Sequence, residues 1–507
     1  MNPGDTLFVS TKPAQHIIGV DIGTTNTKAI AFTVEGTVIA QASITYMPLV
    51  TAAEEHELDV EILFNAVVQT IQQVTAQTGS SFLLGIAFSS AMHSLLAVDQ
   101  AGKPLTNLIT WADLRSSDQA ARLKESDAGK LIYQRTGTPI HPMSPLCKLL
   151  WMKEQRPDIF AAAHKFIGIK ELVFFRFFGQ YLIDHSIASA TGLFDIYDVD
   201  WNKEALLVTG LSADRLSTPV SPTHIVTGIS AAYATMLGIG QDTPFIPGAS
   251  DGCLANVGSG AMQPGDVSLT IGTSGAVRMM AHQPQHDVKE RIFNYILTEQ
   301  WYVSGGPINN GAVLLKWYAE HFLHRTFHHT EDFEWFLQQA SEVPAGAEGL
   351  VFLPYVQGER APVWDAAAKG VFFGIHARHT QAHFMRAIVE GINFALYQVT
   401  QSLEETIGPV TNIYASGGFT KSPHWLQWMA DLFGKKIIVS SAADASATGA
   451  AILGLKAIGK IDDLHFRAKT TQPGEHFLPH EQQREAYLHN YRIYAMLYDR
   501  LKDVFHS

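Results

Sequence analysis

Two Gly-Thr turns in this sequence are suited to binding phosphate. The first, Gly23-Thr24-Thr25, follows a buried run that contains Asp21, and the second, Gly272-Thr273, follows an apolar run about half the chain later. Backbone N–H groups and hydroxyls in such turns bind phosphate oxygens, and a neighbouring carboxylate can hold Mg²⁺ directly or through water. Lys28 adds positive charge. Alone, the first turn is equally well explained as an ordinary hairpin, but two such turns predict one nucleotide between two similar halves.

A further acid, Asp251, follows a run of apolar and small residues at 245–249. A carboxylate there can accept the proton of a hydroxyl that attacks a phosphoryl group. Because Asp251 precedes the helix-like run GCLANVG, it is also a candidate helix N-cap, and by itself the cap is the simpler interpretation. The sequence has neither a Walker A pattern nor G-x-G-x-x-G, so the commonest alternative nucleotide-binding folds have no support.

A polar and aromatic set in the first half of the chain is suited to a polyhydroxylated ligand. It consists of His93, Trp111, Asp113 and Arg115. A simpler alternative is that Asp113 and Arg115 pair on the surface and that His93 is a hydrogen-bonded core residue. Without other observations the residues favour that alternative.

The pair Gly417-Gly418 follows a strand-like run and precedes a helix. Glycine at such a point allows adenine or ribose to approach the backbone, although an ordinary strand-to-helix turn explains it as well. The following helix is expected to begin with Ser422 as N-cap and Pro423 in its first position, and to end at Gly434.

The elements around these residues alternate between strands and helices. Residues 16–32 read as a strand, a polar turn and a returning strand, and residues 266–280 repeat that plan. Residues 59–77 have helical apolar spacing, with Asp59 as a candidate N-cap. This alternation predicts an α/β architecture.

Length and composition bound the possible functions. A chain of 507 residues is too long for one core, and 46% hydrophobic with 17% charged residues indicates a folded globular protein. The net charge of −12 argues against nucleic acid or an anionic membrane as the main partner. Two cysteines make no disulfide framework and favour a cytoplasmic location. No segment is long enough to span a bilayer.

From Ile17 to Gly459 the chain resembles the FGGY family of carbohydrate kinases. Two long signatures carry the resemblance: MSPLCKLLWMKEQ at 143–155 and GVFFGIHARHTQAHFMRAIVE at 370–390. The resemblance implies an α/β, two-domain actin-like ATPase fold of the ribonuclease H-like and hexokinase type, with the active site in the interdomain cleft. The expected bounds are 16–259 for the N-terminal domain, 260–472 for the C-terminal domain and 473–507 for a helical tail.

The resemblance also implies roles for individual residues. Asp251 matches the catalytic base, and Asp21 matches the acid near Mg²⁺. The expected nucleotide-binding residues are Gly23, Thr24, Thr25, Lys28, Gly272, Thr273, Gly311, Gly417 and Gly418. The expected substrate-binding residues are His93, Trp111, Asp113, Arg115, Lys170 and Asp251. Lys148 and Trp151 are better interpreted as residues that stabilise the fold.

Within the family, segments such as FSSAMHS, TWADLRS and GASDGCLANVG resemble gluconokinases. That resemblance implies transfer of phosphate from ATP to the 6-hydroxyl of D-gluconate, with ATP and Mg²⁺ as cofactors. The alternative is a xylulose kinase or another pentulose or polyol kinase, although Trp111-Ala112-Asp113 departs from the Trp-Asn-Asp usual in xylulose kinases. A non-enzymatic nucleotide switch of the actin type is opposed by the sugar-contact segments and Asp251.

Gluconate is an anion, so a cation or a group of N–H donors must offset its charge. The candidates are Arg115, Lys170, His93 and His141, with His93 ranked first as a contact. The simpler alternative is that Arg115 and Lys170 only pair with Asp113 and Glu171. The expected partners are small molecules, with no nucleic acid and no membrane. The oligomeric state is left open, a homodimer being one alternative.

Overall fold

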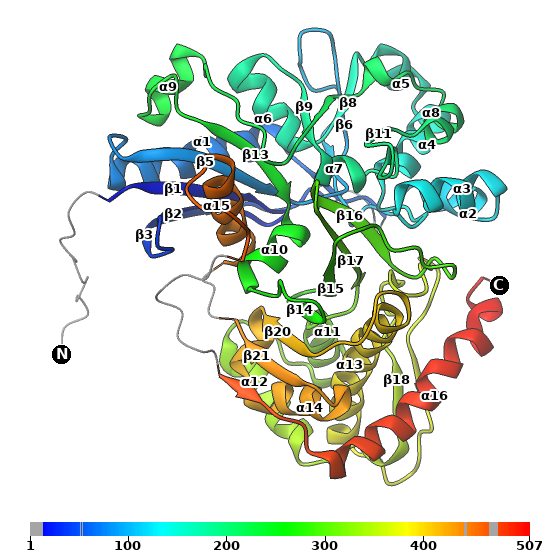
Figure 1. Cartoon of the computed structure of the whole chain (residues 1–507). Helices are drawn as coiled ribbons and strands as arrows, with labels where there is room; N and C mark the ends of the chain where they lie inside the picture. Colours follow the sequence, from blue (N-terminus) through cyan, green and yellow to red (C-terminus); the bar gives the residue numbers. More distant parts are fainter. Residues whose placement is uncertain (1–13, 51, 53, 441–443, 466–474, 507) are drawn as a thin grey trace.

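The computed structural model describes residues 14–50, 52, 54–440, 444–465 and 475–506, and two β-sheets organise this part of the chain (Figure 1). The first sheet has the order β13-β5-β1-β2-β3. Its strands are β1 (His16–Ile22), β2 (Asn26–Thr33), β3 (Val38–Thr45), β5 (Leu83–Ser90) and β13 (Phe245–Ser250). Strands β1, β5 and β13 run parallel, so their carboxyl ends lie at one edge of the sheet.

The two faces of the first sheet are covered by helices from distant parts of the sequence. Because side chains alternate along a strand, Ile18 and Val20 of β1 pack in one cluster with α1 (Val60–Thr78), whereas Ile17 packs in another with α15 (Ala445–Ala457). Asp59 caps α1 by accepting hydrogen bonds from the backbone N–H groups of residues 61 and 62, which confirms the predicted start of this helix.

A long segment of short elements is inserted between β5 and β13. Part of it packs around a separate cluster, whereas residues 169–177 and 234–237 pack in the cluster of α1 and the first sheet. Its helices are α2 (Ser117–Lys124), α3 (Asp127–Thr136), α4 (Pro145–Gln155), α5 (Pro157–Ala162), α6 (Ile169–Phe178), α7 (His185–Ser189), α8 (Lys203–Thr209) and α9 (Ala231–Leu237), with the 3₁₀ turn η1 (Ala213–Arg215). Its strands are β6 (Leu96–Val98), β7 (Leu108–Ile109), β8 (Lys165–Ile167), β9 (Leu182–Asp184), β10 (Phe194–Asp195), β11 (Asp200–Trp201) and β12 (Thr218–Val220); β7 pairs with β4 (Glu57–Leu58).

The second sheet has the order β16-β17-β15-β14-β20-β21-β22. Its strands are β14 (Asp266–Ile271), β15 (Gly275–Ala281), β16 (Phe293–Thr298), β17 (Trp301–Ile308), β20 (Asn412–Ser416), β21 (Lys436–Val439) and β22 (His476–Phe477). As in the first sheet, a hairpin, here β14–β15, opens the sheet, and β14 runs parallel to β20. The strand, turn and returning strand predicted at 266–280 are therefore confirmed.

Helices of the second half surround a large core. They are α11 (Val313–Leu323), α12 (Thr330–Ser341), α13 (Gln381–Thr406), α14 (Pro423–Phe433) and α16 (Glu481–Phe505), accompanied by the hairpin of β18 (Val351–Leu353) and β19 (Val371–Phe373) and by the 3₁₀ turns η2 (Ala347–Gly349) and η3 (Gly418–Lys421). Ser422 caps α14 and Gly434 ends it in the left-handed conformation, as the sequence predicts. Helix α16 runs along the outside of this half (Figure 1).

Two helices join the halves. α10 (Asp251–Ser259) continues from β13, and α15, which comes from the C-terminal part of the chain, lies against it and against β1 (Figure 1). Their backbones are in contact: a Cβ on Gly449 would lie 2.1 Å from the carbonyl oxygen of Leu254, and one on Gly258 would lie 1.9 Å from that of Ala445. Glycine at both positions therefore allows the close approach.

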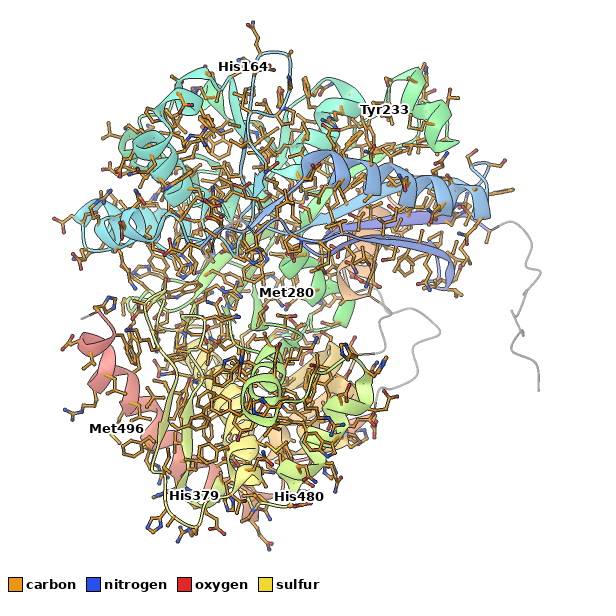
Figure 2. All side chains as sticks on the ribbon, turned by 180° about the vertical axis from the view of Figure 1, so that it is seen from behind. His164, Tyr233, Met280, His379, His480 and Met496 are labelled. Carbon is orange, nitrogen blue, oxygen red and sulfur yellow. The ribbon has the colours of Figure 1, made fainter. Side chains whose placement is uncertain are left out.

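Side chains of both halves share one cluster beside this joint. Met280 of β15 packs in the cluster that also contains Leu254 of α10 and Leu453 of α15, and Figure 2 shows it where the two parts of the molecule meet. Because α15 belongs by sequence to the predicted C-terminal domain but packs on the first sheet, the spatial halves do not follow the predicted bounds strictly. Those bounds stay a prediction, and the one at 472/473 lies outside the described residues. No described helix is long and apolar enough to cross a membrane.

We predict that Gly449→Ala lowers the free energy of unfolding by about 1–3 kcal/mol, because its methyl group must displace backbone. Gly240→Ala is the matched control: Gly240 is exposed, and its Cβ would meet only the hydroxyl of Thr243, at 3.7 Å. Urea or thermal unfolding of the two variants measures the difference. Equal stability of Gly449→Ala and the control would contradict the close contact.

Candidate active site

The ends of the parallel strands collect the residues that the sequence singled out. Asp21 lies near the end of β1, His93 follows β5, and Asp251 directly follows β13. On the second sheet, Gly272-Thr273 follows β14 and Gly417-Gly418 follows the adjacent strand β20. Ligands of open α/β sheets bind beyond the carboxyl ends of the strands, so each sheet offers such an edge.

Asp21 lies in an acidic environment. It accepts a hydrogen bond from the Ser89 hydroxyl at 2.6 Å. Burial, followed by the negative charges of Asp444 and Asp251, raises its pKa to about 7, against which Ser89 and Lys28 act. A buried carboxylate repelled by other carboxylates is stabilised when a cation binds, so this environment fits Mg²⁺.

Lys28 of β2 does not stand alone beside the first turn. Its ammonium forms an ion pair with Asp444 at 2.7 Å, and Asp444 in turn caps α15 by accepting from the backbone N–H of Ala447. Two helices thus begin beside this acidic group, α10 at Asp251 and α15 after Asp444. Their N-terminal ends carry partial positive charge and favour an anion nearby. No three His, Cys, Asp or Glu side chains of the described residues form a metal site by themselves.

The two Gly-Thr turns are held by hydrogen bonds to their backbone, and their Thr residues are not buried. In the first, Tyr46 donates its hydroxyl to the carbonyl of Gly23 at 2.6 Å, Thr24 is half-buried and Thr25 is exposed. In the second, Gly272 and Thr273 are both exposed. Exposed N–H and hydroxyl groups of this kind fit phosphate oxygens.

Two further glycines support the second turn. Gly311 is buried and donates its backbone N–H to the carbonyl of Thr273; a Cβ there would lie 2.6 Å from the carbonyl oxygen of Ser274. Gly311 thus positions the turn from behind. Gly417 has a φ of 102°, and its Cβ would lie 2.4 Å from the carbonyl oxygen of Ile271. Next to it, Gly418 is exposed, with nothing within 4 Å of a Cβ, so the backbone is accessible to a flat ligand.

Asp251 is the first residue of α10, and the prediction that it caps the helix is wrong. Ser250 is the N-cap and accepts from the backbone N–H of Cys253. Within the described ranges, the half-buried Asp251 carboxylate accepts only a local hydrogen bond, from the N–H of Gly252 at 2.8 Å. Burial raises its pKa above the ordinary value, with Arg278 the strongest opposing influence. A carboxyl of this kind is suited to accepting a proton.

His93 is a neutral, fully hydrogen-bonded residue. Its Nδ1 lies 2.7 Å from the carbonyl oxygen of Ala190 and its Nε2 lies 3.3 Å from the hydroxyl of Tyr295, so Nδ1 carries the proton and Nε2 accepts. Burial, together with the nearby charge of Lys148, lowers its pKa to about 3. The prediction of His93 as a sugar contact remains untested, but it supplies no positive charge. The same holds for His141, whose pKa burial lowers well below the ordinary value.

Asp113 and Arg115 pair with each other, as the simpler alternative predicts, but not on the surface. Asp113 has no exposed area and accepts hydrogen bonds from Arg115 and from the backbone N–H of His56. Arg115 also forms an ion pair with Glu57 at 2.8 Å. These two side chains therefore already satisfy each other, which leaves Arg115 no free charge for a substrate.

Lys170 is buried as well, and its predicted alternative partner is wrong. Its ammonium pairs with Asp184 at 2.7 Å and donates to the carbonyl of Ala249 at 3.1 Å, rather than pairing with Glu171. Glu171 instead accepts from the Ser217 hydroxyl and from the backbone N–H of Gly168. Lys170 thus supports the strand that leads to Asp251.

Three charged residues of the site were not predicted from the sequence: Asp444, Arg278 and Arg360. Asp444 stands before an alanine-rich helix, and an Asp in that position is a helix-cap signal. Arg278 interrupts the apolar run of β15, and Arg360 is buried with its Cζ 4.5 Å from the ring centroid of Trp111. A charged residue inside an apolar strand was the available signal for Arg278.

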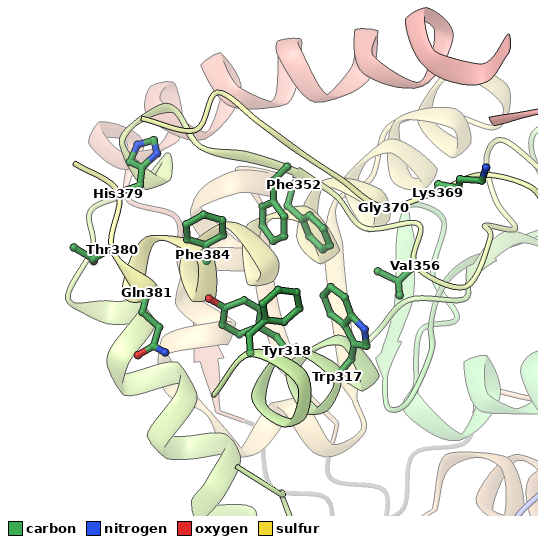
Figure 3. A pocket seen from close by; sticks show the side chains of 12 residues that line it. Trp317, Tyr318, Phe352, Val356, Lys369, Gly370, His379, Thr380, Gln381 and Phe384 are labelled. Atoms are coloured by element: carbon green, nitrogen blue, oxygen red, sulfur yellow. The ribbon is translucent and has the colours of Figure 1, made fainter. Parts of the chain in front are cut away.

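The chain also contains an aromatic cavity of about 620 Å³ away from these residues (Figure 3). It is bounded by Trp317 and Tyr318 of α11 on one side and by Phe352, Phe372 and Phe384 on the other. None of the predicted site residues lines it. The strand ends, not this cavity, therefore bring together the titratable groups.

Comparison with known proteins identifies the family. The N-terminal domain model of the FGGY family of carbohydrate kinases matches residues 16–258, and the C-terminal domain model of that family matches residues 267–458. The chain belongs to the FGGY family of carbohydrate kinases. It therefore has the two-domain FGGY kinase fold that the sequence predicts.

Relatives within this family differ in how similar their sequences are to this chain. The gluconokinase of Bacillus subtilis (strain 168) is 43% identical over 88% of each chain, whereas the xylulose kinase of that organism is 29% identical over 97% of this chain and 98% of its own. Among solved structures, a gluconate kinase from Lactobacillus acidophilus is 34% identical with a TM-score of 0.90, covering 96% of this chain and 98% of its own. A ligand-bound xylulose kinase from the same organism matches with the same values.

The raised pKa of Asp21 predicts a pH-dependent effect of Asp21→Asn. The unfolded chain ionises this carboxyl near its ordinary value of 3.8, whereas the folded protein retains the proton to about pH 7. The wild type therefore loses stability as pH rises through this window, and the penalty is complete above pH 7. Without nucleotide, the stability of Asp21→Asn relative to the wild type should increase between pH 5 and pH 7 and then level off, as measured by thermal unfolding.

Addition of Mg²⁺ and ADP provides the control. It should stabilise the wild type more than Asp21→Asn, because the ionised carboxylate is the form that attracts the cation. Parallel pH curves for the two proteins, with equal stabilisation by Mg²⁺ and ADP, would show that Asp21 has no such role.

Proposed function

We propose that this protein is a gluconokinase, which transfers the γ-phosphoryl group of ATP to the primary hydroxyl of D-gluconate. The observation that carries this proposal is its 42–43% identity over about 90% of the chain with two Bacillus gluconokinases, against 29% with xylulose kinases. The positive charges of Arg278, Lys170 and Arg360, which act on Asp251, support an anionic substrate. Because fold alone does not decide function, the charges on the substrate side of the site are a second line of support.

The residues divide into a nucleotide side and a substrate side. Asp21 and the turns at 23–25 and 272–273 would hold Mg²⁺ and the phosphates, and Gly417-Gly418 would lie against the adenosine. When bound, Mg²⁺·ATP supplies the phosphoryl group and offsets the charge on its oxygens. Asp251 orients the primary hydroxyl and accepts its proton during attack. The N-terminal ends of α10 and α15 add positive potential toward the phosphates.

A xylulose kinase is the second candidate, because the ligand-bound xylulose kinase from Lactobacillus acidophilus matches the structure as well as the gluconate kinase does. The two candidates differ in substrate charge. We further propose a cytoplasmic location. Whether the enzyme forms a homodimer remains a prediction.

A substrate panel separates the two candidates. D-gluconate, neutral D-xylulose and neutral D-glucitol are compared under one set of conditions with saturating Mg²⁺·ATP. We expect kcat/KM to be highest for gluconate by about a hundredfold or more, because charge-assisted hydrogen bonds contribute roughly 1.5–3 kcal/mol each. If the enzyme used xylulose as well as gluconate or better, the proposal of a gluconokinase would be wrong, whereas membership of the FGGY family would still hold.

Substitution of Asp251 tests the proton acceptor. Asp251→Asn preserves the shape of the side chain, and Ser250 still caps α10, so the protein should fold. Gluconate phosphorylation should fall by about two to four orders of magnitude while ATP binding persists. Steady-state kinetics and nucleotide titration measure the two effects. Turnover near that of the wild type in the folded variant would exclude Asp251 as the base.

A further inference from the structure

Arg278 is half-buried and differs from the buried cations of the site in its hydrogen bonds. Its Nε and Nη1 are buried and have no hydrogen-bond partner among the described residues, and no ion pair within that part of the chain includes it. By contrast, Lys148 donates to two carbonyl groups, Lys170 pairs with Asp184, and Arg360 donates from its Nε to the Asn309 side chain at 2.7 Å. Two buried guanidinium nitrogens without acceptors are costly, so their retention calls for a partner that the described part of the chain does not supply.

Arg278 lies beside the first turn of α10, the helix that begins at Asp251. A Cβ on Gly252, the residue after Asp251, would lie 3.0 Å from Nε and 3.3 Å from Nη2 of Arg278, and 2.8 Å from the methyl carbon of Met92. The absence of a side chain at Gly252 therefore makes room for the guanidinium. Gly305 of β17 makes room for the aliphatic part of the Arg278 side chain, because a Cβ there would lie 3.2 Å from Cγ of Arg278.

The charges around Arg278 explain why Asp251 does not neutralise it. The two residues influence each other: Arg278 opposes the rise of the Asp251 pKa, and Asp251 opposes the fall of the Arg278 pKa. No ion pair joins them, although both are described. Arg360 adds a second positive charge near the same place, since it lowers the pKa of His93 and contacts the ring of Trp111. One side of the site is thus positive while the carboxylate of Asp251 stays available.

We propose that Arg278 binds the carboxylate of the sugar acid and determines the preference of the site for an anionic substrate. This proposal rests on the proposed function. A carboxylate is an acceptor-only group that pairs well with a guanidinium, and such charge-assisted hydrogen bonds are the strong ones in proteins. The primary hydroxyl, at the opposite end of the same molecule, is then directed toward Asp251.

The test compares Arg278→Met, Arg278→Lys and the control Arg122→Met. Arg122 of α2 is 60% exposed and pairs with Glu154 on the surface. For each protein we would measure the gluconate dissociation constant without nucleotide, the ATP dissociation constant, and kcat and KM for D-gluconate and D-glucitol. D-glucitol has the same carbon chain but carries a neutral hydroxymethyl group in place of the carboxylate.

We expect Arg278→Met to raise the dissociation constant and KM for gluconate by about a hundredfold, with a smaller change in kcat. ATP binding and the use of glucitol should change less than about threefold, and Arg278→Lys should recover part of the gluconate affinity. Because the substitution removes a cation with two buried, unpaired nitrogens, the ligand-free Arg278→Met protein should unfold at the wild-type temperature or higher. The control should match the wild type in every measurement.

Two results would overturn the proposal. If the gluconate dissociation constant of Arg278→Met equals that of the wild type, Arg278 does not bind the substrate carboxylate. If kcat falls equally for gluconate and glucitol while gluconate binding persists, Arg278 acts on the transferring phosphoryl group instead. A wrong proposed function would give a different result. The wild-type enzyme itself would then use neutral D-glucitol better than D-gluconate, independently of the Arg278 variants.

Discussion

Helices α10 and α15 approach each other so closely that neither Gly258 nor Gly449 has room for a side chain. This contact fixes where both helices begin, and they begin at the two acids Asp251 and Asp444. It also attaches a helix from the C-terminal part of the chain to the first sheet. One packing contact between the two helices therefore fixes the positions of Asp251, the first residue of α10, and of Asp444, the cap of α15.

That arrangement separates charges within the site. Burial, followed by the negative charges of Asp444 and Asp251, raises the pKa of Asp21 to about 7, and a bound cation would relieve the repulsion between these carboxylates. On the substrate side, Arg360 is buried and Arg278 is half-buried, and removal from water lowers the pKa of both guanidinium groups. A protein of net charge −12 can therefore attract an anionic sugar acid locally.

The residues that sequence reasoning placed correctly are those whose role is local. Short sequence patterns predict several features that the structure contains. These are the strand with Asp21 and the turn after it, the Asp59 and Ser422 caps, and the hairpin at 266–280. Two long signatures gave the family. The position of Asp251 after an apolar strand indicates a functional residue. The prediction that Asp251 caps the helix is wrong, because the preceding Ser250 is the N-cap.

The residues that sequence reasoning missed act through distant contacts. Asp444 meets Lys28 across more than four hundred residues of sequence, and Arg278 becomes unusual only because Gly252 and Gly305 make room for it. Likewise, Lys170 pairs with Asp184 rather than with the adjacent Glu171, since α6 directs the neighbouring side chains differently. No spacing rule connects these pairs, because the fold brings them together.

A structure of the Asp251→Asn protein with ADP, Mg²⁺ and D-gluconate tests the central claim most directly. The account predicts that the phosphates lie between the turns at 23–25 and 272–273, with the primary hydroxyl of gluconate beside position 251 and its carboxylate on Arg278. Nucleotide bound elsewhere, for example in the aromatic cavity beside Trp317, or gluconate bound with its carboxylate directed away from Arg278, would contradict it.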